Sequence, residues 1–364
     1  MAGFEGTVWA PGQYRYTLSN RKTEMLDADA KTHAVSRSVH YGLFLVFEGI
    51  RFFVREDEGR LQVVFLNIDQ NVQRFRDGIA FNLRDDQLDQ LPSRSQMMEI
   101  FLGYLGHPQL RGFLTEMARN RSQGYLRPFT VDDDQSIGVT FAANPVIRAV
   151  AAHYRSYLGE PFHGVAIPWL VRAVGGNGTG CLKLGGNYLL SVKAVQAAKR
   201  LNPQAGAALF LDDRPHADLR DRTISEWDSS AAMVGLADGT VIRIPDSPLI
   251  LPSVTVRGIT AILRDMGVRV EERNLTYGEL VDRSRAGEVA TVASLGTAGI
   301  LNRVSSLLLV DNDRQPLTTI ETDTTSAVFA AFGQARSTYW DIYRGDAEVP
   351  AGLDLTHHDV GAAA

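Results

Sequence analysis

The sequence predicts a two-domain protein in which β-strands and α-helices are mixed. At 364 residues the chain exceeds one ordinary hydrophobic core and suits two domains of common size. The runs 43–53 and 207–212 are dense in apolar, β-branched and aromatic residues and indicate buried strands. The runs 189–200 and 326–343 have apolar residues at helical spacing. We therefore expect both kinds of element.

Composition and charge narrow the class of protein. With 45% hydrophobic and 22% charged residues, the chain has the proportions of a soluble globular protein. A net charge of −5 without a basic stripe argues against a nucleic-acid or membrane-surface role. No apolar run is long enough to span a bilayer, and no secretory signal stands out. The single Cys181 excludes a disulfide framework and a multi-cysteine metal site. We expect a cytoplasmic protein that binds small molecules and no metal.

The first part of the chain is expected to begin with an irregular arm of about thirty residues, because its mixed polar sequence shows no clear periodicity. Glu48 and Gly49 then interrupt the apolar run 43–53. A glycine inside a strand often marks a bulge or a close approach of the backbone to a ligand. The elements expected after this run are a strand at 61–65, a helix at 70–79, a helix at 96–119 and a strand that begins within 124–129.

The second part of the chain is expected to follow a glycine- and proline-containing connection. We expect a small N-terminal domain at 1–156, an interdomain loop at 157–165 and a large C-terminal domain at 166–364. The elements expected in the large domain are strands at 207–212 and 268–273, helices at 189–200, 260–264, 276–284 and 326–343, and a disordered Ala-rich tail.

The most informative stretch is 180–188, in which Lys183 lies among glycines. A lysine in water has a pKa of about 10.4 and is a poor nucleophile at pH 7, so amine chemistry requires burial or a cationic neighbour. Glycines let the backbone approach a flat ligand, and Leu182 and Leu184 supply apolar walls. Taken alone, the stretch is more typical of a solvated lysine in a loop before a helix than of a reactive one. The glycine run 175–180 lacks the lysine–serine or lysine–threonine pair of a P-loop, so we expect only a flexible lead into Lys183.

The segment 183–188, Lys-Leu-Gly-Gly-Asn-Tyr, resembles the Schiff-base lysine motif of the branched-chain amino acid aminotransferases. These are fold-type IV enzymes of pyridoxal 5′-phosphate (PLP). The resemblance extends from about His33 to the final helix, and its specificity lies in the order and spacing of several motifs. The further matching segments are 40–42, 47–51, 71–75, 124–128, 222–230, 252–259 and 294–299.

The resemblance implies which residues bind PLP. Lys183 would hold the cofactor as an aldimine and, once displaced by substrate, move the proton between Cα and C4′. Arg74 would grip the phosphate, because a guanidinium makes bidentate charge-assisted bonds. Glu226 would keep the pyridine nitrogen protonated, so that the ring acts as an electron sink. The other cofactor contacts implied are Tyr188 on the ring hydroxyl, and Val254, Thr255, Gly296 and Thr297 on the phosphate.

The resemblance also implies the substrate pocket. Phe47 would form its apolar wall, Tyr125 would line it, and Arg127 would help to hold the substrate α-carboxylate. Thr297 and Ala298 would offer a hydroxyl and backbone amides to the same carboxylate.

The fold that the resemblance implies is the two-domain α+β architecture of fold-type IV PLP enzymes, as in the D-amino acid and branched-chain aminotransferases. The cofactor would lie between the domains, and a homodimer would complete the site. The implied reaction is transfer of an amino group between an L-amino acid, branched-chain by resemblance, and a 2-oxo acid such as 2-oxoglutarate.

Some positions depart from the family pattern. An extra residue precedes the 70–79 helix near Leu66, and Asp228 and Ala231 stand where the family has glycine and asparagine. We expect Asp228 to add a charge near the pocket and to disfavour leucine and isoleucine as donors. Another fold-type IV reaction stays open, either aminodeoxychorismate lyase-like or that of a specialised-metabolism aminotransferase. A non-catalytic binding descendant is less favoured, because Lys183 and Glu226 are intact.

Overall fold

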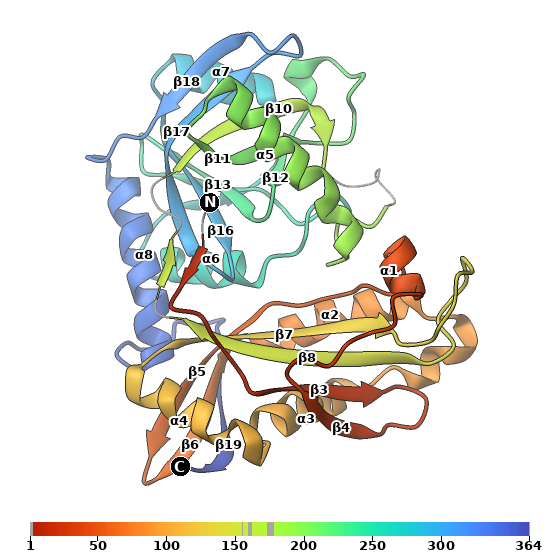
Figure 1. Ribbon diagram of the computed structural model, residues 1–364. Helices are drawn as coiled ribbons and strands as arrows, with labels where there is room; N and C mark the ends of the chain where they lie inside the picture. The colour runs from red at the N-terminus through yellow and green to blue at the C-terminus, as the bar shows by residue number, and fades with distance from the viewer. Residues whose placement is uncertain (1–2, 155, 159–161, 173–177, 364) are drawn as a thin grey trace. The chain divides into compact units, whose positions relative to one another are not determined.

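The chain forms two compact units. The computed structural model describes residues 3–154, 156–158, 162–172 and 178–363 (Figure 1). The first unit, called the N-terminal unit below, comprises Phe4–Ser156, Leu182–Gly186 and Asp354–Ala364. The second, called the C-terminal unit, comprises Met1–Gly3, Tyr157–Cys181 and Asn187–Leu353. Lys183 therefore groups with the N-terminal unit, although the residues on either side of 182–186 group with the other. The first half of the glycine lead expected before Lys183, residues 175–177, lies outside the described residues.

The N-terminal unit is built on an antiparallel sheet. Its described strands follow the order β19-β6-β5-β7-β8-β3-β4, and β2 also pairs with β8. The strands are β2 (Val8–Trp9), β3 (Gly12–Thr17), β4 (Thr23–Asp27), β5 (Ile50–Asp57), β6 (Arg60–Leu66), β7 (Gln123–Asp132), β8 (Pro145–Tyr154) and β19 (Leu355–Ala362). The helices are α1 (Arg37–Tyr41), α2 (Ile68–Asn82), α3 (Arg94–Leu105) and α4 (Arg111–Asn120), with 3₁₀ turns at Asp85–Gln90 and Pro108–Leu110.

Several expectations for this unit are wrong. The first thirty residues are not an irregular arm, because they contain β3 and β4, and β3 alternates buried and half-buried side chains as a strand with one covered face does. The helix expected at 96–119 is two helices, since Gly106 ends α3 and Pro108 opens the turn that follows. The tail expected to be disordered contains β19, which Figure 1 shows in blue beside β6.

The core of the N-terminal unit depends on a close contact between α2 and the segment that precedes β5. Val72, Phe75 and Ile79 form the fully buried face of α2. Gly78 lies on this face, and a Cβ placed on it would be 2.4 Å from Cγ1 of Val46. Only glycine lets Val46 approach the helix so closely, and Val46 is completely buried. The segment around Val46 is therefore fixed by the packing of α2.

The C-terminal unit contains a closed barrel. Its described strands follow the order β12-β11-β10-β17-β16-β13-β14-β15, and β18 pairs with β17. Because β12 also pairs with β13, the six strands from β12 to β13 in that order form a ring. The strands are β10 (Phe162–Val171), β11 (Ala205–Leu211), β12 (Ile224–Trp227), β13 (Ala231–Leu236), β14 (Val241–Arg243), β15 (Val270–Glu272), β16 (Val289–Gly296), β17 (Ile300–Val310) and β18 (Pro316–Glu321).

Four described α-helices accompany the barrel: α5 (Leu189–Leu201), α6 (Val254–Asp265), α7 (Tyr277–Arg285) and α8 (Ala327–Arg344). Helix α5 packs on β10 and β11, and α8 packs on α6 (Figure 1). The hydroxyls of Ser253, Thr276 and Ser326 cap α6, α7 and α8 by accepting a backbone N–H of the first turn. The helices expected at 189–200, 276–284 and 326–343 are thus confirmed with ends within a few residues. Within the described ranges, the helices are all too short or too polar to cross a membrane.

The range expected to be an interdomain loop, 157–165, overlaps two strands. The short β9 (Ser156–Leu158) lies at its start, and β10 already begins at Phe162. Strand β9 pairs with β1 (Gly3–Glu5).

The contact between Gly78 and Val46 can be tested by adding one methyl group. Gly78→Ala is expected to lower the free energy of unfolding by about 1–3 kcal/mol, because the new Cβ forces Val46 out of place. Gly112→Ala is the matched control: Gly112 is also helical, but a Cβ there meets no atom within 4 Å. The control should be neutral or up to about 1 kcal/mol more stable. Urea unfolding measures both, and equal stabilities for the two variants would contradict this packing.

Candidate active site

The backbone of Lys183 is held in the N-terminal unit by strand-like pairing. The N–H of Phe47 donates to the carbonyl of Lys183 at 3.1 Å, and the N–H of Gly185 donates to the carbonyl of Leu45 at 3.0 Å. Val46 and Leu184 form an antiparallel bridge between these two bonds. The segment 45–48 is fixed in turn on β7, because the N–H of Glu48 donates to the carbonyl of Pro128 at 2.9 Å. The position of Lys183 is therefore set by two successive layers of backbone hydrogen bonds.

Three predicted substrate residues lie together with Lys183. The amine nitrogen of Lys183 is 5.1 Å from the ring centre of Phe47. On the same ring, Cζ of Arg127 lies 4.7 Å from the centre, and its Nη2 donates to the Tyr125 hydroxyl at 2.8 Å. Cations at such distances from an aromatic ring are attracted by its electron-rich face. The cluster combines an amine, a guanidinium and an apolar wall, which suits a ligand with a carboxylate and an apolar side chain.

Gly49 makes this cluster possible. A Cβ at position 49 would be 2.1 Å from the hydroxyl oxygen of Tyr125, so any side chain larger than hydrogen would displace the tyrosine. The glycine at this position is thus explained by a close approach of the backbone to the Tyr125 side chain.

Arg74 lies on the buried face of α2 and forms an ion pair with Glu48. Its Nε donates to one carboxylate oxygen at 2.7 Å and its Nη2 donates to the other at 2.5 Å. Glu48 is completely buried, and the N–H of Gly49 donates to it at 2.8 Å. Burial alone would raise the pKa of Glu48, but the charge and hydrogen bonds of Arg74, with a smaller contribution from Lys183, hold this pKa below its usual range. Glu48 was not predicted as the partner of Arg74, although a glutamate inside an apolar run requires a buried cation.

Glu226 is buried in the C-terminal unit and paired with an arginine that was not predicted as a site residue. Nη1 of Arg172 donates to Oε1 of Glu226 at 2.6 Å, and the N–H of Leu251 donates to the same oxygen at 3.2 Å. Cζ of Arg172 lies 5.2 Å from the ring centre of Tyr188. Arg172 therefore brings Glu226 and Tyr188 into one cluster. The sequence signal that could have identified Arg172 is its position directly after the apolar run 162–171.

The remaining predicted cofactor residues lie at element ends of the C-terminal unit. Val254 and Thr255 form the first turn of α6, where backbone N–H groups have no intrahelical acceptor. Gly296 ends β16, and Thr297 and Ala298 form the turn into β17. These positions suit the binding of an anion by backbone amides.

The expectation that Asp228 adds an unpaired charge near the pocket is wrong. Its Oδ1 accepts the N–H of Ala208 at 2.9 Å, and its own N–H donates to the carbonyl of Ala208 at 2.9 Å. The carboxylate thus continues the pairing of β12 with β11. Burial raises the pKa of Asp228, against the opposing effect of the Ala208 hydrogen bond. The neighbouring Trp227 is also structural, since its indole N–H donates to the carbonyl of Ala293 at 3.1 Å inside the core.

Comparison with known proteins shows similarity to branched-chain-amino-acid aminotransferases. No family model matches the chain. It is 27% identical over 285 residues to the probable branched-chain-amino-acid aminotransferase of Staphylococcus aureus strain N315, which covers 76% of this chain and 72% of that protein. It is 27% identical over 275 residues to branched-chain-amino-acid transaminase 1 of Bacillus subtilis strain 168, which covers 74% of this chain and 70% of that protein.

Solved structures agree with the sequence relatives. The branched-chain amino acid aminotransferase from Escherichia coli has a TM-score of 0.67 at 21% identity, covering 94% of this chain and 98% of that one. The expected resemblance to the branched-chain aminotransferases is confirmed, and with it the fold-type IV architecture.

The pairing of Asp228 leads to a prediction about pH. A carboxyl whose pKa is raised on folding costs stability at pH values above its unfolded pKa, near 3.8, where the buried group must ionise. Asp228→Asn keeps an acceptor for Ala208 without the charge, so it should be more stable than the wild type at pH 7. This difference should disappear as the pH falls to about 3.8.

Asp228→Ala removes the acceptor and leaves the Ala208 N–H unsatisfied, so it should be about 1–3 kcal/mol less stable than Asp228→Asn at every pH. Urea unfolding at several pH values measures both variants. An alanine variant as stable as the asparagine variant would show that the hydrogen bond to Ala208 is unimportant.

Proposed function

We propose that this chain, which resembles the branched-chain aminotransferases in sequence and fold, is a PLP-dependent transaminase. The observation that supports this most directly is the position of Lys183 beside Phe47, Tyr125 and Arg127. A transaminase needs an amine for the cofactor and, beside it, an apolar wall and a cation for the α-carboxylate of an amino acid.

The residues present fit PLP. The cofactor has a phosphate that needs a cation, a ring nitrogen that needs a carboxylate and an aldehyde that needs an amine. The chain offers a buried arginine, a buried glutamate and a lysine beside Phe47. The residues that would hold it are Lys183, Arg74, Tyr188, Glu226, Val254, Thr255, Gly296 and Thr297. When bound, PLP supplies an electron-poor ring that stabilises the negative charge formed at the substrate Cα.

Each side chain of the proposed site would then have a separate role in amino transfer. Lys183 would hold the cofactor through its amine and, when released by substrate, would accept the proton from Cα and deliver it to C4′ of the cofactor. Glu226 would accept a hydrogen bond from the ring N–H of the cofactor, and Arg172 orients this carboxylate. Arg127 binds the α-carboxylate, with Thr297 and Ala298 as further donors, while Phe47 and Tyr125 enclose the side chain.

The substrates we propose are an L-amino acid with a branched aliphatic side chain and a 2-oxo acid, with 2-oxoglutarate as the usual acceptor. The apolar face of Phe47 supports an aliphatic side chain. The pairing of Asp228 removes the reason to expect poor use of leucine. We place the reaction in the cytoplasm, on the basis of the single cysteine.

A second candidate is another fold-type IV reaction on the same scaffold. It is favoured by Ala231, where the resembled family has asparagine, and by the extra residue near Leu66. Such an enzyme would use Lys183 and Glu226 in the same way but act on a different amino acid or release a different product.

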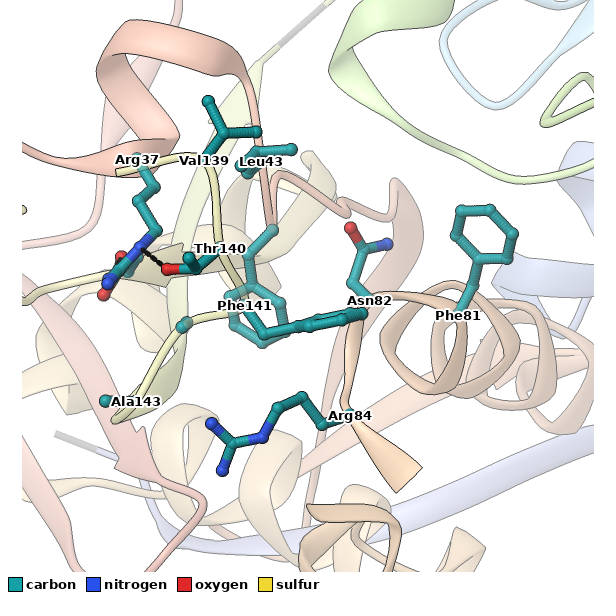
Figure 2. Close-up of a pocket in the computed structure, with 12 residues that line it drawn as sticks. Arg37, Leu43, Phe81, Asn82, Arg84, Val139, Thr140, Phe141 and Ala143 are labelled. Atoms are coloured by element: carbon teal, nitrogen blue, oxygen red, sulfur yellow. Dashed lines mark hydrogen bonds and ion pairs between the residues drawn. The ribbon is translucent and has the colours of Figure 1, made fainter. Parts of the chain in front are cut away.

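We further infer a homodimer. The N-terminal unit has a hollow of about 930 Å³ whose rim is rich in exposed apolar side chains (Figure 2). Phe81 is 59% exposed, Val139 70% and Phe141 50%. In Figure 2 Arg37 reaches Thr140 on one side of the hollow, and Phe81 extends from α2 on the other. Exposed apolar side chains gathered in this way are typical of a protein interface, and a second copy is the partner we propose.

The first experiment tests the cofactor and the reaction. Borohydride reduction of the PLP-loaded protein, followed by peptide mapping, should place the adduct on Lys183. The same protein should transfer the amino group of leucine or valine to 2-oxoglutarate. Lys183→Ala should lose both properties.

The Glu226→Gln variant distinguishes cofactor binding from amino transfer in the same assay. It should still give the Lys183 adduct but slow amino transfer at least about a hundredfold, because the ring nitrogen loses its anionic partner. An adduct on another lysine, or none with excess PLP, would contradict the proposed site. An adduct on Lys183 with no transfer from any aliphatic donor would favour the second candidate.

The dimer is tested by molar mass in solution. Light scattering should give about twice the chain mass of 40.0 kDa. Phe141→Asp should shift the population towards the monomer, because a charge at an apolar interface is costly. Trp9→Asp is the matched control, since Trp9 is 68% exposed but does not line the hollow. A wild-type monomer, or equal shifts in both variants, would exclude this surface as the interface.

A further inference from the structure

The hairpin between β16 and β17 contains two energetically unfavourable features that the stability of the barrel does not explain. Gly296 pairs with Ile300, so residues 297–299 form the loop of this hairpin. Ile300 has a φ of 61°. It is the one β-branched residue with a positive φ in the described part of the chain, and a β-branched side chain is strained there. Because Ile300 is completely buried, the packing of its side chain holds the strained backbone in place.

The second unfavourable feature is the side-chain amide of Asn302. Asn302 is 8% exposed, and its Oδ1 has no hydrogen-bond partner among the residues that the structure describes. Asn302 lies on the same face of β17 as Val304, which belongs to the barrel core. A buried acceptor without a donor lowers the stability of a protein. The amide is therefore present at this position for a reason other than a hydrogen bond within the barrel.

The amide of Asn302 packs against the backbone of the loop. A Cβ placed on Gly299 would lie 2.8 Å from both Cγ and Oδ1 of Asn302, so the amide occupies the space beside the Gly299 Cα. The amide thus separates the loop from the barrel core. Gly299 directly follows Thr297 and Ala298, the partly exposed loop residues of the proposed site.

We propose that Asn302 is a positioning residue of the anion site. Its amide keeps the loop 297–299 at a fixed distance from the barrel core, so that the loop N–H groups and the Thr297 hydroxyl stay available to a phosphate group. The strain at Ile300 is the cost of holding the loop in this shape before the ligand binds. This inference rests on the proposed function for the identity of the ligand, PLP, but the contact between Asn302 and Gly299 does not depend on it.

The binding test uses the cofactor-free protein and two probes, PLP and inorganic phosphate, each titrated by calorimetry. Asn302→Ala should weaken the binding of both probes at least about tenfold, which is the effect of losing one hydrogen bond to a charged group. Its urea midpoint should equal or exceed that of the wild type, because an unpaired buried acceptor is removed and the loop can relax. Asn302→Leu keeps a side chain of similar shape, so its affinities should stay within about threefold of the wild type.

Thr260→Val is the matched control for Asn302→Ala. Thr260 is likewise a buried residue of the C-terminal unit, 2% exposed, and its hydroxyl oxygen has no partner within the described ranges. It lies on α6 and not in the hairpin. Its replacement should leave the affinities for PLP and for inorganic phosphate unchanged.

A double substitution tests the contact itself without any ligand. Gly299→Ala should lower the urea midpoint, because the new Cβ meets the amide of Asn302. In the Asn302→Ala background there is room for this Cβ. The same change should then alter the unfolding equilibrium constant at least about tenfold less.

An Asn302→Ala variant that binds phosphate like the wild type would overturn the inference. A variant that is markedly less stable, or that fails to fold, would also overturn it, since the amide would then be an ordinary core group. Equal losses of affinity in Asn302→Leu, or equal effects of Gly299→Ala in both backgrounds, would exclude a steric role for the amide.

The two probes distinguish this inference from the proposed function. If the wild type binds inorganic phosphate but no PLP, the proposed function fails, and the phosphate affinities alone decide the role of Asn302. If the wild type binds PLP and Asn302→Ala binds it equally well, the role of Asn302 fails while the proposed function stands. A wild type that binds neither probe would overturn both.

Discussion

The site of the N-terminal unit depends on the pairing between the segments 45–47 and 183–185. Two backbone hydrogen bonds attach the lysine segment to a chain that is itself attached to β7. Backbone pairing of this kind does not depend on side-chain identity, so it fixes the lysine Cα while leaving the amine to be adjusted by its neighbours. Val46 anchors the arrangement through its contact with Gly78.

Both clusters of candidate residues are built on a buried arginine–glutamate pair. Arg74 binds Glu48 in one unit and Arg172 binds Glu226 in the other, and all four side chains are almost inaccessible to solvent. A buried ion pair of this kind contributes little net stability, because desolvation offsets most of the attraction. The pair instead fixes the orientation of each charged side chain. Binding of a ligand then costs no conformational entropy for ordering that side chain.

The sequence was sufficient to predict which side chains gather around Lys183, but not the partners that hold the buried charged residues. Lys183, Phe47, Tyr125 and Arg127 were predicted from the order of motifs, and the structure brings them together. Their roles toward a ligand stay predictions. Glu48 and Arg172 were missed because their partners lie 26 and 54 positions away in sequence, and pairing at that range leaves no local pattern. Asp228 was misjudged for the same reason, since its acceptor role depends on a neighbouring strand.

The errors in the fold have local causes. Strand β3 does alternate, with Tyr14 and Tyr16 buried between half-buried polar residues, and this short period-2 pattern was overlooked. The break between α3 and α4 was visible as Gly106 followed by Pro108. Strand β19 contains two histidines, an aspartate and a glycine, so its propensity for strand is low, and its pairing with β6 supplies what its composition lacks.

The position of β19 has a consequence for how the protein is made. The sheet of the N-terminal unit gains its strand beside β6 from residues 355–362, which a ribosome synthesises after the whole barrel of the C-terminal unit. Until then the edge of β6 is open, and an unpaired edge strand readily joins another chain. The nascent protein therefore keeps its first-made sheet incomplete until the barrel residues have been synthesised, and the barrel has the opportunity to fold before that sheet does.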